Sequence, residues 1–273
     1  MAHPLLPTYF LSHGGGPWPF MREQFGQRYD VLDAALKDMP RQIGVTPEAV
    51  LVISAHWEGP NFLVSSSARP PMIYDYGGFP PHTYEIQYPA PGAPALAERV
   101  KALLDGAGHP ARLDPERGFD HGTFSAMYPI YPAADVPIVQ LSIRHGYDVA
   151  THIEAGRALA PLRAEGVLIV GSGLSYHNLR QFGPAGSLAS RQFDGWLRAS
   201  MALAPAEREA RMRDWAGAPG ARQAHPREDH LVPLWVALGA AEREPAEVVY
   251  HEDDFFGALA VSSFRFGAGA GDH

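Results

Sequence analysis

The chain has 273 residues and a formal net charge of −8 at pH 7, a length that suits one large domain. Hydrophobic residues make up 46% of it and charged residues 19%, which favours a packed core over a disordered chain. No long run of lysine and arginine offsets the negative charge, so we expect no nucleic-acid partner. Because the sequence has no cysteine, disulfides, iron–sulfur clusters, thiolate-bound zinc and thiol nucleophiles are excluded.

Residues 1–10 lack the basic segment, apolar core and cleavage site of a signal peptide. No apolar run in the sequence reaches the ~20 residues that a membrane-spanning helix requires. We therefore expect a cytoplasmic protein without a membrane partner.

Apolar runs and helical periodicities define the predicted elements. Continuous runs of valine, isoleucine and leucine indicate strands covered on both faces, and apolar residues spaced three or four apart indicate helices. In chain order, the elements are strands at 9–11 and 49–53, a helix at 95–104, a strand at 136–143, a helix at 151–165 that Pro161 shortens or kinks, a strand at 167–170, helices at 191–203 and 230–241, a strand at 247–250 and an edge strand at 258–266.

This alternation predicts one α/β domain over residues 1–273. We expect a central, mostly parallel or mixed sheet flanked by helices, with the active site at the carboxyl ends of the strands. The glycine-rich tail at 266–273 is expected to be frayed.

The stretch 65–94 is rich in proline and fits neither a helix nor a strand. Loops of this length inside a compact domain are commonly functional, and aromatic residues argue against disorder. We interpret the stretch as an ordered cover over a pocket, and a rigid crossover that only packs on the surface is the equal alternative. The aromatic residues in question are Tyr74, Tyr76, Phe79, Tyr84 and Tyr88.

Histidines follow three of the predicted strands after turns of small residues. His13 comes after the first strand, His56 after the second and His177 after the strand at 167–170. In open α/β sheets, ligands bind beyond the carboxyl ends of the strands, and small residues let the backbone approach a ligand closely. One such histidine is commonly structural, but three at one sheet edge point to a shared ligand. A thiol-free site of this kind suits Fe(II), Zn(II), Mn(II) or Ni(II).

Two polar segments supply further candidates. His121 lies in a polar turn, and His225 and His230 lie in a segment that leads into the helix predicted at 230–241. Five residues correspond to about 140° around a helix, so at most one of this pair is expected to face the strand ends. Spacing does not choose between them, and Glu228 is a third candidate ligand.

Competing motifs are incomplete. Residues 13–16 (HGGG) resemble the oxyanion turn of some α/β hydrolases, but the G-x-S-x-G nucleophile elbow of that family is absent. The P-loop, the G-x-G-x-x-G fingerprint and the H-E-x-x-H zinc motif are absent from the sequence as well.

Seven short motifs occur in a characteristic order along nearly the whole chain. They are LSHGG at 11–15, SAHW at 54–57, GGFP at 77–80, YPAPG at 88–92, GFDHG at 118–122, HNLR at 177–180 and HPREDHLVPL at 225–234. Each motif is short, but the ordered set resembles the class III extradiol ring-cleaving dioxygenases of the LigB superfamily, in particular the branch that includes the 4,5-DOPA dioxygenases.

The resemblance implies a mononuclear non-haem metal site, with Fe(II) expected for turnover. By motif, His13, His56 and His230 would be the metal ligands, His177 the catalytic acid/base, and His121 a residue near substrate or dioxygen. A histidine at position 230 departs from the carboxylate of the broader superfamily and agrees with the DOPA-type branch. Three neutral imidazoles also suit Zn(II), so zinc is a second candidate for the bound ion.

The implied reaction inserts both atoms of dioxygen into a catecholic substrate, with extradiol ring cleavage to a muconic semialdehyde-type product. The expected partners are a small aromatic diol and dioxygen. Two alternatives stay open: a zinc-dependent hydrolase that uses a histidine-bound water, and a non-catalytic relative that binds a metal or a partner. His177 and His121 argue against the second alternative, because a structural metal needs no additional acid/base residue.

No substrate-contacting residue is assigned. For four further residues, a position in the pocket wall and ordinary packing elsewhere are equal alternatives. These residues are His82, Tyr84, Tyr176 and Asn178. Solvated or locally hydrogen-bonded positions are expected for the remaining histidines, which are His3, His109, His145, His152, His251 and His273.

Overall fold

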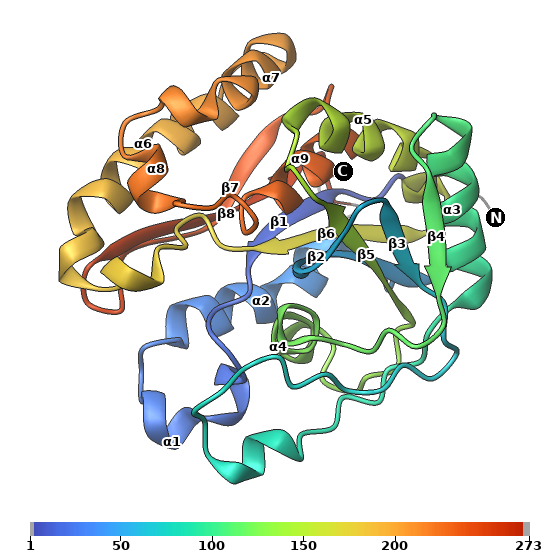
Figure 1. Ribbon diagram of the computed structural model, residues 1–273, viewed down its shortest axis with the longest axis horizontal. Coiled ribbons are helices and arrows are strands. Elements are labelled where there is room, and N and C mark those ends of the chain that lie inside the picture. The colour runs from blue at the N-terminus through green and yellow to red at the C-terminus, as the bar shows by residue number, and fades with distance from the viewer. Residues whose placement is uncertain (1–2, 270–273) are drawn as a thin grey trace.

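The computed structural model describes residues 3–269, and one mixed sheet of eight strands lies at its centre (Figure 1). The strand order across the sheet is β4-β3-β5-β2-β6-β1-β8-β7. The prediction of one α/β domain with a central mixed sheet is confirmed. The strands are β1 (Thr8–Ser12), β2 (Ala49–Gly59), β3 (Phe62–Ser65), β4 (Ala111–Asp114), β5 (Ile138–Arg144), β6 (Val167–Gly173), β7 (Ala246–Phe255) and β8 (Leu259–Phe266).

Parallel pairing of β5, β2, β6 and β1 forms the middle of the sheet. Val52 of β2 pairs with Gln140 of β5 and with Val170 of β6, and β6 is buried on both faces. The continuous apolar runs of the sequence therefore form strands that helices cover on both sides. Parallel alignment also brings the carboxyl ends of β1, β2 and β6 to one edge of the sheet.

Helices flank this sheet on both faces. α5 and α9 cover one face, and α2 and α4 cover the other (Figure 1). α9 is buried along its whole length, because it packs on β1, β2 and β6 on one side and on α5 on the other. The helices are α1 (Arg22–Phe25), α2 (Asp30–Ile43), α3 (Pro94–Gly106), α4 (His121–Ile130), α5 (Val149–Leu159), α6 (Ser187–Met201), α7 (Pro205–Arg213), α8 (Ala221–Ala224) and α9 (Val232–Ala240).

Within residues 3–269, no helix has the length and apolar character needed to cross a membrane.

Prolines explain some of the differences between predicted and observed helices. α5 ends at Leu159, and a 3-10 helix (Ala160–Glu165) that contains Pro161 replaces the end of the predicted helix, because proline has no N–H to donate. α2 and α4 were not predicted, and each contains an internal proline, Pro40 or Pro129.

The prediction that the segment 258–266 forms an edge strand is wrong. β8 lies between β1 and β7, and all of its residues are buried. Its polar residues imitate the alternation of an edge strand, but they point into polar contacts: Ser263 Oγ accepts from the N–H of Ser12 at 2.9 Å, and Ser262 Oγ donates to Asp194 at 2.6 Å. The predicted tail starts too early, since Phe266 belongs to β8, and residues 270–273 lie outside the described residues.

His152 shows how one histidine outside the sheet edge serves the fold. Its Nδ1–H donates to the carbonyl of Asp148 at 2.7 Å, and its Nε2 accepts from the N–H of Arg144 at 3.1 Å. These two bonds need the neutral imidazole, and burial lowers the pKa of His152 to about 4. The local hydrogen bonding expected for this residue is confirmed.

We predict that His152 makes stability fall as the pH falls. Its folded-state pKa lies below the unfolded value of about 6.5, so the folded state binds fewer protons and loses stability between pH 6.5 and pH 4. His152→Asn keeps the donor toward Asp148 and removes this titration. The free energy of unfolding of the wild type relative to that of the variant, measured with urea, should fall by about 2 kcal/mol from pH 7.5 to pH 5. A difference that is the same at both pH values would contradict the prediction.

Candidate metal centre

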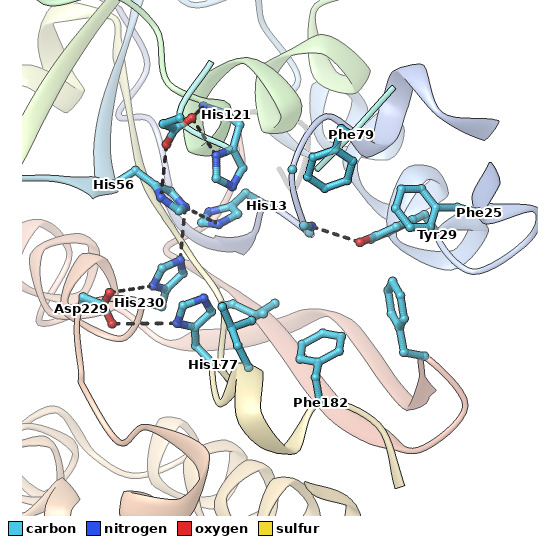
Figure 2. Close-up of a pocket in the computed structure, with 17 residues that line it drawn as sticks. His13, Phe25, Tyr29, His56, Phe79, His121, His177, Phe182, Asp229 and His230 are labelled. Atoms are coloured by element: carbon cyan, nitrogen blue, oxygen red, sulfur yellow. Dashed lines mark hydrogen bonds and ion pairs between the residues drawn. The ribbon is translucent and has the colours of Figure 1, made fainter. Parts of the chain in front are cut away.

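Five histidines from separate segments meet at the carboxyl edge of the parallel strands (Figure 2). His13 follows the last residue of β1, His56 lies near the end of β2, and His177 follows β6. His121 is the first residue of α4, and His230 precedes α9. The structure thus brings all the histidines singled out by the resemblance to one place.

Ring nitrogens form the centre of this cluster. His56 Nε2 lies 3.1 Å from His13 Nε2 and 3.2 Å from His230 Nε2. The ring of His177 stacks on that of His230, with centroids 3.3 Å apart, and the ring of His121 lies 4.0 Å from that of His56. Ligand nitrogens at 2.0–2.1 Å from a zinc-sized ion lie roughly 3.0–3.4 Å from one another, so the observed separations fit one cation.

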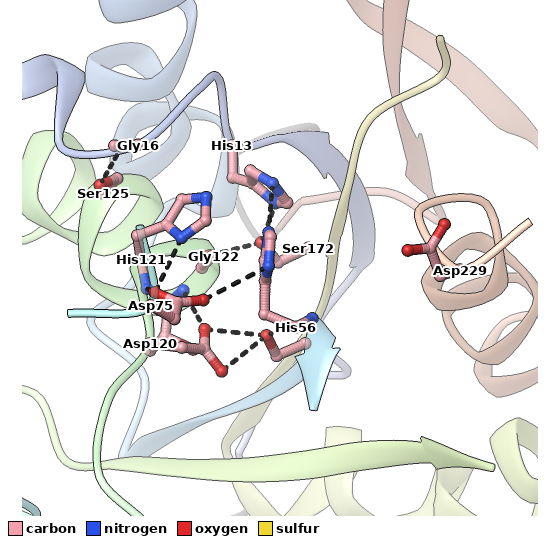
Figure 3. A network of polar contacts seen from close by, with 12 residues as sticks. His13, Gly16, His56, Asp75, Asp120, His121, Gly122, Ser125, Ser172 and Asp229 are labelled. Carbon is pink, nitrogen blue, oxygen red and sulfur yellow. Dashed lines mark hydrogen bonds and ion pairs between the residues drawn. The ribbon is translucent and has the colours of Figure 1, made fainter. Parts of the chain in front are cut away.

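The proton on His13 can be placed from its hydrogen bonds (Figure 3). The hydroxyl of Ser172 donates to the carbonyl of Gly122 at 2.5 Å, so it accepts from His13 Nδ1–H at 3.0 Å. Nε2 of His13 therefore carries a lone pair and no proton. Facing His56 Nε2 at 3.1 Å, this lone pair is a ready metal ligand.

Burial keeps the three central imidazoles neutral. Burial, followed by the neighbouring His56 and His230, holds the pKa of His13 well below its ordinary value. Burial, followed by His177 and His56, does the same for the pKa of His230, and burial lowers the pKa of His56 to about 4. Neutral imidazole is the form that binds metals, so the donor set fits a divalent ion.

Two aspartates complete the cluster, and sequence reasoning missed both. Asp75 Oδ1 accepts from the backbone N–H of His121 at 2.9 Å and from its ring Nδ1–H at 2.8 Å, while Oδ2 lies 3.3 Å from His56 Nδ1. Although burial raises the pKa of Asp75, its hydrogen bond with His121 leaves it below the ordinary value. Such carboxylates orient metal-binding histidines.

Asp229 acts on the opposite side of the cluster (Figure 2). Its Oδ2 lies 3.3 Å from His230 Nδ1, and its Oδ1 lies 4.0 Å from His177 Nδ1. Asp229 lies outside regular structure, because α9 begins only at Val232. Its position next to His230 in the sequence was the available signal.

More than one set of three residues could hold an ion. Besides the central nitrogens, the ligand atoms of His13, His56 and His121 lie within 4.8 Å of one another, and so do those of His177, Asp229 and His230. The two sets adjoin through the 3.2 Å contact of His56 with His230.

The alternative candidates near His230 lie elsewhere. His225 is fully buried between Phe193 and Trp215, and its Nε2–H donates to the carbonyl of Ser175 at 2.9 Å. Glu228 pairs with Arg222 at 2.7 Å. The assumption that His225 and His230 share a helix is wrong, because α8 ends before the first and α9 starts after the second.

Small residues in β6 serve a different purpose from the one expected. A Cβ added to Gly173 would lie 2.1 Å from the carbonyl of His230, and one added to Gly171 would lie 2.3 Å from that of Pro233. These glycines let the segment before α9 and the first turn of α9 approach the sheet, and the N–H of Leu174 donates to the His230 carbonyl at 3.1 Å. The glycines of β6 therefore position His230, and they do not bring the backbone close to a bound molecule as expected.

The start of α4 links several parts of the cluster. Asp120 caps the helix by accepting from the N–H of Thr123, and it also accepts from Ser54 Oγ at 2.9 Å (Figure 3). The next residues are His121 and Gly122, whose carbonyl orients His13 through Ser172. Space is tight here, because a Cβ on Gly122 would lie 2.8 Å from His56 Cδ2.

A cavity of about 590 Å³ opens beside the histidines. Its far side is lined by aromatic side chains from separate segments, namely Phe25, Tyr29, Phe79, Phe182 and Phe256 (Figure 2).

The stretch 65–94 contributes less to this cavity than expected. It is ordered and supplies Asp75 and Phe79. Tyr74, Tyr76 and Tyr88 do not line the cavity, because their hydroxyls donate to the carbonyls of Ile86, Thr83 and Tyr131, respectively. The other pocket candidates also lie outside the lining, and they are His82, Tyr84, Tyr176 and Asn178.

Comparison with known proteins gives consistent matches over most of the chain. The family described as the catalytic LigB subunit of aromatic ring-opening dioxygenase matches residues 7–265. A Portulaca grandiflora protein named 4,5-DOPA dioxygenase extradiol is 38% identical over 265 residues, 95% of each chain. A protein of the same name from Escherichia coli strain K12 is 34% identical, over 98% of this chain and 97% of that one. The crystal structure of an uncharacterized Escherichia coli K12 protein matches with a TM-score of 0.76 and 31% identity, over 96% of this chain and 100% of that one.

We predict that Gly122→Ala weakens metal binding. The new methyl group would displace His56, and changes of this kind around a metal ligand typically cost roughly 10–100-fold in affinity. Gly195→Ala in α6 is the matched control, because its Cβ would meet no atom within 4 Å. Zinc titration of both variants measures the effect. Equal affinities would show that His56 can move without loss.

Proposed function

Because the chain belongs to the LigB family of catalytic subunits of aromatic ring-opening dioxygenases, we propose that it is an extradiol dioxygenase that acts on a catechol. In the proposed reaction, one ring carbon–carbon bond beside the diol breaks, and both atoms of dioxygen enter the product, a muconic semialdehyde. The observation that carries this proposal is the convergence of the Nε2 atoms of three buried imidazoles beside a cavity with two further histidines.

We assign His13, His56 and His230 as the ligands of the metal. The Nε2 atom of His56 lies 3.1 Å from that of His13 and 3.2 Å from that of His230. An Fe(II) ion held there would bind the two catechol oxygens, lower the pKa of their hydroxyls and supply the electron transfer between catechol and dioxygen. Zn(II) fits the same nitrogens but is redox-inert. A zinc-loaded chain would therefore bind a catechol without cleaving its ring.

His177 is the proposed acid/base. It lines the cavity and stacks on His230 at 3.3 Å, which places it next to the metal ligands. Asp229 lies 4.0 Å from its Nδ1 and favours a proton there, so Nε2 is left to accept a proton from the catechol. The same nitrogen would return the proton to an oxygen of the opened ring.

His121 is proposed to act beside the substrate or dioxygen. Its Nδ1–H is held by Asp75 at 2.8 Å, so its Nε2 is an acceptor. His121 lines the cavity next to His56, and from there it can accept a hydrogen bond from a substrate hydroxyl.

Oxygen uptake by the Fe(II)-loaded chain tests the function. After anaerobic loading, a catechol should consume one dioxygen per molecule and give a yellow ring-opened product. Metal-dependent ester or amide cleavage without oxygen uptake would instead indicate a hydrolase, and the absence of any turnover would indicate a binding protein.

We predict that His230→Ala loses its metal and that His225→Ala keeps it. Only the first variant removes a proposed ligand, since His225 bonds to the carbonyl of Ser175. The loss should exceed the roughly 10–100-fold typical of an outer partner. Metal content per chain after dialysis measures it, and full occupancy in His230→Ala would rule out this ligand assignment.

His177→Ala should retain metal but turn over about 100-fold more slowly or worse, because general acid–base catalysis typically contributes roughly 10²–10⁴-fold. Metal content and the rate of oxygen uptake are measured on the same sample. Near-normal turnover would remove the acid/base role.

A further inference from the structure

The cavity has two ends of different chemistry. Histidines and the two aspartates occupy one end, and aromatic rings occupy the other (Figure 2). Its volume of about 590 Å³ lies within the roughly 300–1,000 Å³ of pockets that hold drug-sized ligands. A catechol ring at the histidines would therefore leave room for a substituent at the aromatic end.

The aromatic end is a continuous cluster. The ring of Phe256 lies 5.2 Å from that of Tyr29, 5.2 Å from that of Phe182 and 6.2 Å from that of Phe25. The Tyr29 hydroxyl accepts from the N–H of Gly15 at 3.1 Å, and burial raises the pKa of Tyr29, so it is uncharged. These contacts make the far end apolar and electrically neutral.

Charged groups are confined to the histidine end or to the outside. Among the described residues that line the cavity, none is lysine or arginine, and the aspartates Asp75 and Asp229 both contact histidines. The exposed guanidinium of Arg28 lies outside the lining, 5.7 Å from the ring of Phe256, and Arg227 is paired with Glu58.

Either charge on a substituent would be poorly accommodated at the aromatic end. A carboxylate would lose its hydration against phenyl rings, and the guanidinium of Arg28 lies outside the lining, over the ring of Phe256, where it cannot replace that hydration inside the cavity. An ammonium group would gain a cation–π interaction, but it would find no carboxylate at that end and would lie near Arg28. An apolar group instead gains free energy with every methylene that it buries.

We infer that the substrate is a catechol whose ring carries an apolar, uncharged substituent, and that the rings of Phe25, Tyr29, Phe182 and Phe256 hold this substituent. The inference rests on the proposed function, because it takes the diol to lie at the histidines.

Binding to the zinc-loaded chain tests the preference without turnover. Three ligands are compared by calorimetry: 4-butylcatechol, 3-(3,4-dihydroxyphenyl)propanoate and dopamine, whose substituents are neutral, anionic and cationic. We expect 4-butylcatechol to bind at least about tenfold more tightly than the other two. Equal or tighter binding of the propanoate or of dopamine would overturn the inference.

A pair of matched variants tests the location. Leu179 lines the cavity and is 70% exposed, whereas Leu188 is 71% exposed and lies outside the lining. Leu179→Arg should raise the affinity for the propanoate relative to 4-butylcatechol at least about tenfold, and Leu188→Arg should leave the ratio unchanged. An unchanged ratio in Leu179→Arg, or the same shift in both variants, would overturn the inference.

Oxygen uptake by the Fe(II)-loaded chain separates this inference from the proposed function. Ring cleavage that is fastest with the propanoate or with dopamine would support the function and overturn the inference. An apolar preference in binding, with no oxygen uptake for any of the three, would leave the binding preference standing and refute the function.

Discussion

The candidate site depends on one electrostatic constraint, which is that the unprotonated Nε2 atoms of His13 and His56 face each other at its centre. Two lone pairs that are 3.1 Å apart, as on His13 and His56, repel each other unless a cation lies between them. Burial lowers the pKa of both imidazoles and so disfavours the protonated forms that would relieve this repulsion. The opposite ring nitrogens contact Ser172 and Asp75. The protons therefore lie at the periphery of the cluster, and the lone pairs lie at its centre.

Backbone packing maintains this arrangement at two places. At β6, Gly171 and Gly173 let the segment before α9 lie against the sheet, so His230 reaches the strand ends. At α4, Gly122 gives His56 its space, and its carbonyl orients His13 through Ser172. Both places need residues without a side chain, although none of these three glycines lines the cavity. The proposed metal ligands are thus held by close packing at glycines between segments that lie far apart in the sequence.

The strand pattern alone predicted much of the frame and part of the site. Parallel, buried strands bring residues at their carboxyl ends together, and this rule is sufficient to place His13, His56 and His177 at one edge of the sheet. His121 and His230 needed the family resemblance, because neither follows a strand, and helix spacing did not separate His230 from His225.

Other features had no local signal in the sequence. Asp75 contacts a histidine 46 positions away from within a segment without regular structure. The aromatic end combines residues from α1, the start of α2, the segment after β6 and the β7–β8 turn. The tyrosines of the stretch 65–94 looked equally suited to a pocket, but their hydroxyls bind backbone carbonyls. Contacts between distant parts of the chain determine where these side chains lie. The periodicity of the sequence carries no information about such contacts.

The position of Asp75 ties the irregular segment to the centre. One carboxylate contacts both His56 and His121, and the residues beyond it supply Phe79 to the cavity. Any exchange of this segment between related chains would therefore alter ring orientation and cavity shape together. A change confined to 76–94 would reach the cavity through Phe79, whereas a change at position 75 would reach two imidazoles at once.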